Sequence, residues 1–296
     1  MQVTAAMVKE LRERTGAGMM ECKKALVEAG GDLELAVDNM RKSGQAKADK
    51  RAGRVAAEGL IAIQADESAG RGVLVEVNCE TDFVAKEEDF KAFAMQAAAR
   101  ALAEQPADVE ALAALELEAG ASQTFAERRT ELVARIGENI TLRRLAFVDA
   151  SGGPLGAYSH GGRIGALVGL KGGTAEVAKD IAMHVAASRP LALNEAGLAA
   201  DVLDKEREIV KAQVADSGKP PEIQAKMITG RMAKYLKEVT LTGQPFVKDP
   251  DRTVAQYLAA AGAEVTAFVR FEVGEGIEKK SENFAEEVMA QVRDSA

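Results

Sequence analysis

The residues that most often carry chemistry are few and widely spaced in this sequence of 296 residues. Its two histidines are His160 and His184, and its two cysteines are Cys22 and Cys79. Zinc and other transition-metal sites need such ligands at short, regular spacing, so neither pair predicts a metal site. The cysteines favour a reducing compartment over a disulfide framework. A buried or capping role is the more ordinary interpretation of each histidine.

Known catalytic motifs are missing from the sequence as well. No HExxH, GxSxG or glycine-rich dinucleotide motif occurs, and Gly218-Lys219 is followed by Pro220 where a phosphate-binding loop requires Ser or Thr. An enzyme with a small ligand in the glycine-rich stretch 152–173 is the weakest hypothesis, because no nucleophile–base pair accompanies that stretch. No catalytic residue, metal or cofactor is expected.

The segment Thr81-Asp82-Phe83-Val84, here called the TDFV turn, joins a predicted strand to a predicted helix. In one interpretation Thr81 or Asp82 caps the helix and Phe83 packs into the core. In the other, a rigid turn presents an acid and a bulky ring outward, as the anchors of protein interfaces do. Composition does not choose between the two, although Phe83 is conspicuous in a chain with 4% aromatic residues and no Trp.

A second candidate contact surface lies near the amino terminus. Met19 and Met20 are adjacent on a predicted helix, so their side chains point about 100° apart and hardly share one core. We expect one of them to be exposed. A flexible thioether suits an adaptable contact surface, although gap-filling in a core is the commoner role of Met.

Three short helices are predicted within residues 1–44. Apolar residues recur at helical spacing, glycines separate the helices, and the third helix is expected to stop at Gly44. So small a bundle buries little surface alone, which favours a docking module. The basic stretch 45–57 is predicted to be a linker.

The rest of the chain is predicted to be α+β, with a core of two related halves. Each half has antiparallel strands followed by a helix, and the helix segments 93–99 and 181–187 match closely in residue type. We therefore expect a pseudo-duplicated core made of subdomains 58–138 and 139–280.

Two further helical segments are predicted outside this core pattern. Pro220-Pro221 interrupts a helical pattern at about 201–236, which predicts an inserted antiparallel helical hairpin. Residues 281–296 are predicted to form a carboxy-terminal amphipathic helix that carries Phe284, Val288 and Val292.

Composition limits the classes of partner. The length suggests roughly two domains, and 47% apolar residues suffice for a core. A net charge of −8 argues against nucleic acid as the main ligand. No apolar run reaches the roughly 20 residues of a membrane span, and no signal-peptide pattern is visible. We expect a cytoplasmic protein with no membrane or direct nucleic-acid partner.

Five segments together resemble the elongation factor Ts family of translation factors. They follow the family's order and span nearly the whole chain: Leu11-Arg12-Glu13-Arg14-Thr15-Gly16-Ala17-Gly18-Met19-Met20, Asn78-Cys79-Glu80-Thr81-Asp82-Phe83-Val84, Tyr158-Ser159-His160-Gly161-Gly162-Arg163-Ile164-Gly165, Leu241-Thr242-Gly243-Gln244-Pro245-Phe246, and Arg270-Phe271-Glu272-Val273-Gly274-Glu275-Gly276-Ile277-Glu278.

The resemblance implies a nucleotide exchange factor. Such a protein binds the GTPase elongation factor Tu and releases its GDP by disturbing the magnesium and phosphate site, without covalent chemistry. The resemblance implies that the TDFV turn acts near that magnesium site, and that the hairpin is the family's coiled-coil insertion. It also implies that a UBA-like (ubiquitin-associated-like) amino-terminal module contacts the partner through Leu11, Met19 and Met20. The second half of the core is implied to contribute His160, and the last helix Phe284, Val288 and Val292.

The main alternative is an interaction adaptor. In that hypothesis the amino-terminal module is ubiquitin-associated-like and binds an acidic or ubiquitin-like surface, while the α+β halves are only a scaffold. The adaptor predicts no effect on nucleotide release. The sequence leaves the oligomeric state open.

Overall fold

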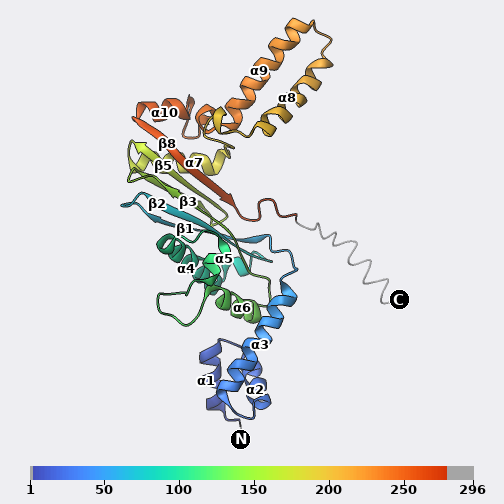
Figure 1. The fold of residues 1–296 in the computed structure, drawn as a ribbon, viewed down its shortest axis with the longest axis vertical. Helices are drawn as coiled ribbons and strands as arrows, with labels where there is room; N and C mark the ends of the chain where they lie inside the picture. The colour runs from blue at the N-terminus through green and yellow to red at the C-terminus, as the bar shows by residue number, and fades with distance from the viewer. Residues whose placement is uncertain (1–2, 279–296) are drawn as a thin grey trace, which may run out of the picture.

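A computed structural model describes residues 3–278 of the chain (Figure 1). The amino-terminal helices lie at one end, two sheets with their covering helices lie in the middle, and a long helical hairpin lies at the other end. Antiparallel sheets mixed with helices confirm the predicted α+β class. Within residues 3–278 no helix is both long and apolar enough to cross a lipid bilayer.

The amino-terminal module consists of α1 (Ala5–Thr15), α2 (Met19–Glu28) and the first half of α3 (Leu33–Arg51). Thr4 caps α1, and Asp32 caps α3 by accepting a hydrogen bond of 3.0 Å from the Leu35 amide. The first helix ends at Gly16, whose φ of +65° favours glycine. The three helices share a small core that includes Leu11, Cys22, Leu26 and Ala36.

The prediction that the third helix stops at Gly44 is wrong. Helix α3 continues to Arg51, so half of the predicted linker 45–57 is helical. Gly44 is buried, and a Cβ added there would lie 3.4 Å from the Ala134 side chain. A glycine inside a helix is tolerated where it allows a neighbouring helix to approach. Ala48, one turn later, packs in the core of the first sheet.

The first sheet has the order β1 (Glu58–Asp66), β2 (Arg71–Cys79), β3 (Thr141–Asp149), and all its pairs are antiparallel. Helices α4 (Glu88–Glu104), α5 (Val109–Ala114) and α6 (Phe125–Ile136) cover its outer face (Figure 1). The predicted boundary between residues 138 and 139 is therefore wrong for β3, which pairs with β2 in the first sheet. A strand pattern identifies a strand, but does not determine its partner.

The second sheet has the order β4 (Leu155–His160), β5 (Ile164–Gly172), β8 (Ala263–Glu272), again antiparallel, with α7 (Ala175–Ser188) on its outer face. The inner faces of the two sheets pack against each other through Ile61, Leu74, Leu167 and other apolar residues. A Cβ added at Gly165 would lie 2.6 Å from the Ile61 side chain, so glycine is required for this close contact.

The hairpin consists of α8 (Ala200–Ala215) and α9 (Pro221–Val239), so the predicted insertion is present with slightly wider bounds. Helix α9 begins at Pro221, where a proline is tolerated because the first helical N–H needs no partner. Val210 and Val214 are buried, whereas Ile209 and Ile223 remain exposed.

Shorter elements complete the structure. They are the 3-10 helices η1 (Val84–Lys86), η2 (Glu195–Gly197) and η3 (Leu241–Gly243), the strands β6 (Pro245–Phe246) and β7 (Asp249–Thr253), and α10 (Val254–Ala260). The predicted carboxy-terminal helix 281–296, with Phe284, Val288 and Val292, lies outside the described residues.

Candidate partner-binding site

The TDFV turn follows β2 and forms a single tight turn before α4. The amide of Ala85 donates to the Thr81 carbonyl at 3.3 Å, and that of Lys86 donates to the Phe83 carbonyl at 3.0 Å. Val84 packs into the core of the first sheet, whereas the side chain of Phe83 is 77% exposed. The interpretation that Phe83 packs into the core is therefore wrong, because neighbouring residues of this turn face opposite environments.

Glu138 lies under the turn, on the segment between α6 and β3. Its carboxylate accepts hydrogen bonds from the amides of Glu80 and Thr81, at 3.1 and 3.0 Å, and from the Thr81 hydroxyl at 2.7 Å. The Thr81 hydroxyl in turn accepts from the Val84 amide at 3.3 Å. Sequence reasoning missed Glu138, because it is 57 residues from Thr81 and no local pattern marks it.

The exposed side of the turn carries the charges of Asp82 and Lys86. Lys86 Nζ donates to the Asp82 carboxylate at 2.6 Å, and this hydrogen bond lowers the pKa of Asp82. The same ammonium lies 5.8 Å from the centroid of the Phe83 ring. An exposed ion pair adds little stability, so its consequence here is a defined orientation of an acid, a base and a ring on one surface.

A groove of about 550 Å³ lies beside the turn. Asp82, Lys86 and residues of α4 form one part of its lining, and β1 and the turn between β4 and β5 form the rest. The Ile61 amide donates to the Gly162 carbonyl at 2.7 Å, which joins the two sheets at this place. The TDFV turn, through Asp82, and the 158–165 segment, through Ser159 and Gly161, therefore lie along one groove although they are far apart in sequence.

His160 ends β4, next to Gly161 and Gly162, which line the groove. Its ring stacks on that of Tyr158, with centroids 6.4 Å apart, and it is exposed. A buried or capping role is thus wrong for His160. It is right for His184, which is fully buried, with Nε2 2.9 Å from Gln244 Oε1 and Nδ1 accepting from the Val247 amide.

Two methionines of the amino-terminal module, Met19 and Met20, are both exposed. Met19 and Met20 begin α2, and their side chains are 60% and 75% exposed. Leu11, expected to contact a partner with them, is fully buried in the module's own core. That expectation is wrong, because Leu11 lies on the face of α1 that packs against the other two helices.

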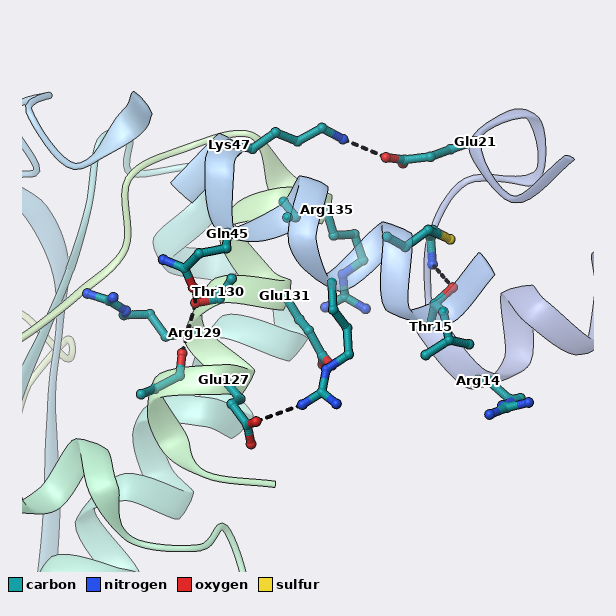
Figure 2. A pocket seen from close by; sticks show the side chains of 17 residues that line it. Arg14, Thr15, Glu21, Gln45, Lys47, Glu127, Arg129, Thr130, Glu131 and Arg135 are labelled. Atoms are coloured by element: carbon teal, nitrogen blue, oxygen red, sulfur yellow. Dashed lines mark hydrogen bonds and ion pairs between the residues drawn. The ribbon is translucent and has the colours of Figure 1, made fainter. Parts of the chain in front are cut away.

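A second cavity, of about 460 Å³, lies where the module meets α6 (Figure 2). Arg41 of α3 pairs with Glu127 of α6 at 2.6 Å, and Lys47 reaches back to Glu21 of α2 at 2.5 Å. The labelled arginines extend in different directions around this cavity rather than toward one point. The first pair connects the module to α6 of the first sheet's helical layer, and the second connects α2 to the second half of α3.

Metal-ligating and buried titratable side chains are the two kinds that bear on reactivity among the described residues. Among residues 3–278 no group of three or more His, Cys, Asp or Glu side chains could hold a metal ion. Burial raises the pKa of Cys79 to about 12, so its thiol stays protonated at neutral pH. Burial also lowers the pKa of His184, which keeps that imidazole neutral in its hydrogen-bonded position.

Comparison with known proteins decides the family. The family model described as "Elongation factor TS" matches residues 80–275, which include the TDFV turn, β3, the second sheet and the hairpin. An elongation factor Ts from Thioalkalivibrio sulfidiphilus is 60% identical over 294 residues, which are 99% of each chain. One from Methylococcus capsulatus is 59% identical over the full length of both chains. The chain belongs to the elongation factor Ts family.

Membership in the elongation factor Ts family assigns this chain to protein biosynthesis, as an exchange factor of translation elongation. The match covers the TDFV turn in full and the groove lining from Asp82 to Arg163, whereas the β1 residues of the lining precede the matched range. The similarity to the two elongation factor Ts relatives extends further, across the amino-terminal module.

Proposed function

We propose that the chain binds GDP-loaded elongation factor Tu and promotes release of GDP by disturbing its magnesium and phosphate site, so that GTP can bind. The observation that carries this proposal is the presentation of Phe83. A large ring is 77% exposed on a turn whose backbone is anchored by Val84 and Glu138. An exposed aromatic on a rigid support is the kind of side chain that dominates protein interfaces.

The mechanism follows from the rigidity of the turn. Phe83 inserts between helices of the partner and shifts the backbone that holds the phosphates, while the turn disturbs coordination of Mg²⁺. Loss of that ion removes the largest local counter-charge of the phosphates. Because coupling between two ligands is reciprocal, the nucleotide weakens binding of the exchange factor by the same factor as the exchange factor weakens binding of the nucleotide.

The second contact is the amino-terminal module. We assign it a UBA-like fold and a role in binding the GTPase domain through Met19 and Met20, two exposed apolar side chains at the start of α2. Two contacts on one chain raise the affinity of the whole, since the second forms at a high effective concentration. His160, beside the groove, contributes a further contact from the second sheet.

The remaining parts of the proposal concern the core and the carboxy terminus. We interpret the two sheet-and-helix units as related copies, with the hairpin inserted in the second copy. The last segment contacts the partner through Phe284, Val288 and Val292. The exchange needs no covalent chemistry, cofactor or nucleic acid, and we place it in the cytoplasm.

The test is release of a fluorescent GDP analogue from elongation factor Tu, followed by stopped flow. We expect Phe83→Ala to slow the maximal release rate about 30-fold, the loss typical of an interface hot spot of 2 kcal/mol. Leu191→Ala, which shortens another exposed apolar side chain at 61% exposure, is the matched control and should release GDP at the wild-type rate.

Two results would overturn the proposal. If the wild-type chain leaves the release rate unchanged, the adaptor hypothesis is the better one. If Phe83→Ala releases GDP as fast as the wild type while it binds normally, the ring is not the wedge.

A further inference from the structure

A crossed pair of hydrogen bonds fixes the start of the TDFV turn to the corner between α6 and β3. The Glu80 amide donates to the carboxylate of Glu138 at 3.1 Å, and the Asn139 amide donates to the carboxylate of Glu80 at 2.7 Å. Helix α6 ends just before this corner, at Gly137, whose φ of +85° reverses the chain direction. The backbone of the corner therefore has a fixed conformation, and it is hydrogen-bonded to the start of the turn.

The carboxylate of Glu138 uses both of its oxygens on the turn. One oxygen accepts from two consecutive amides, those of Glu80 and Thr81. The other accepts from the Thr81 hydroxyl at 2.7 Å, which orients that hydroxyl to accept from the Val84 amide. Hydrogen bonds to an ionised acceptor are stronger than neutral ones, so this carboxylate orders three donors at the residues that precede Phe83.

The other contacts of the turn do not replace this carboxylate. The pair between Asp82 and Lys86 is exposed on both sides, so solvent screens it. The side chain of Val84 anchors the far end of the turn by apolar packing, which is not directional. The Thr81 carbonyl accepts from the Ala85 amide and the Cys79 thiol, but the amides of Glu80 and Thr81 are held by the hydrogen bonds to Glu138.

We propose that Glu138 is a positioning residue for nucleotide exchange, which holds the TDFV turn in the conformation that presents Phe83 to the partner. This inference rests on the proposed function of the turn. Glu138 acts through the turn, since its carboxylate is engaged by Glu80 and Thr81. Removal of the Glu138 carboxylate therefore keeps every exposed contact side chain of the turn, but the turn is no longer held in one conformation.

The first test needs no partner and uses the full chain. Amide hydrogen exchange, measured by NMR, should show faster exchange at Glu80 and Thr81 in Glu138→Ala, while amides of β5 keep wild-type rates. Glu138→Gln retains an acceptor oxygen and should give intermediate rates. Glu110→Ala, which shortens an exposed glutamate of α5, is the control and should change neither amide. Unchanged exchange at both amides in Glu138→Ala would overturn the inference.

The second test measures release of fluorescent GDP from elongation factor Tu at increasing concentration of the exchange factor. We expect Glu138→Ala to lower the maximal rate about tenfold, the factor that corresponds to one lost hydrogen bond to a charged group. The half-saturating concentration should stay within about twofold, because the exposed contact residues remain. Glu138→Gln should recover part of the maximal rate.

A double-mutant cycle with Phe83→Ala separates positioning from general damage. If Glu138 acts through the presentation of Phe83, its removal should slow release little further in the Phe83→Ala background. Additive losses, or a loss confined to affinity, would refute the positioning role.

The rate of GDP release with the wild-type chain separates failure of the positioning role from failure of the proposed function. If the wild type accelerates release and Glu138→Ala does so equally well, only the positioning role is refuted. If the wild type does not accelerate release, the proposed function is refuted as well. If Glu138→Ala does not fold, Glu138→Gln takes its place in the cycle.

Discussion

Glu76 offers the sharpest test of how the two sheets are held together. It lies on β2 and is fully buried, although it is an acid. Its carboxylate accepts hydrogen bonds from Arg143 at 2.9 Å and Arg144 at 2.5 Å, both on β3, and from the Gly274 amide at 2.8 Å. Gly274 follows β8 of the second sheet, so a carboxylate on β2, the strand that leads to the TDFV turn, joins both sheets.

Glu76→Gln removes the charge with little change in volume. Breaking a buried ion pair on one side costs about 3–5 kcal/mol. We expect the lower end, about 3 kcal/mol, because both arginines keep partial access to water and Arg144 also pairs with Glu275. For a chain of this size, that loss lowers Tm by roughly 5 °C.

The pH dependence supplies an independent check. Burial raises the pKa of Glu76, but the hydrogen bonds from Gly274, Arg144, Arg143 and Asn78 outweigh it, so the net shift is below the ordinary value of 4.5. A carboxyl whose folded pKa is depressed stabilises the fold above its unfolded pKa, and this contribution is lost as pH falls through the folded value. The difference between wild type and Glu76→Gln should therefore shrink below about pH 4.5.

Differential scanning calorimetry at pH 7 and pH 4 measures both effects. Glu110→Gln, at an exposed position of α5, serves as the control and should change Tm by less than about 1–2 °C. A Tm for Glu76→Gln within the range of that control at pH 7 would refute the reasoning. So would a difference from wild type that stays constant down to pH 4.

Three further predictions concern the amino-terminal module. Leu11→Ala should destabilise the module by about 3 kcal/mol in denaturant unfolding, because Leu11 is fully buried. Met20→Ala should leave unfolding unchanged within about 0.5 kcal/mol and should raise the Kd for elongation factor Tu in titration calorimetry. Deletion of residues 1–31 should keep the core's Tm within a few degrees, whereas deletion of 1–44 should lower it further, because it cuts α3 one turn before Ala48. Equal Tm values for the two deletions would contradict the packing of α3 on α6.

The ends of several elements could be predicted from local chemistry. Thr4 and Asp32 cap helices where a side-chain acceptor precedes an apolar helical pattern. Pro220-Pro221 marks the turn of the hairpin, because a proline is tolerated at a helix start but not inside. These features depend on neighbours within a few residues, which the sequence contains directly.

Other features could not be predicted because a distant segment decides them. Gly44 breaks an isolated helix, but in the folded chain it lies against Ala134 of α6, and packing outweighs its low helix propensity. The strand 141–149 has a clear β pattern, yet its place in the first sheet depends on pairing with β2. Leu11, Met19 and Met20 all have apolar side chains, and only the packing of the three helices separates the buried Leu11 from the two exposed methionines.

The sequence by itself determined the α+β class, the inserted hairpin, the TDFV turn as a candidate contact and, through five ordered motifs, the likeness to a family. The tertiary structure alone decided that Phe83 points outward while Val84 points inward, and that Glu138 holds the turn. The reason is the range of the forces involved. Periodicity and capping act over a few residues, whereas burial and the pairing of a carboxylate with amides 57 residues away depend on how the whole chain packs.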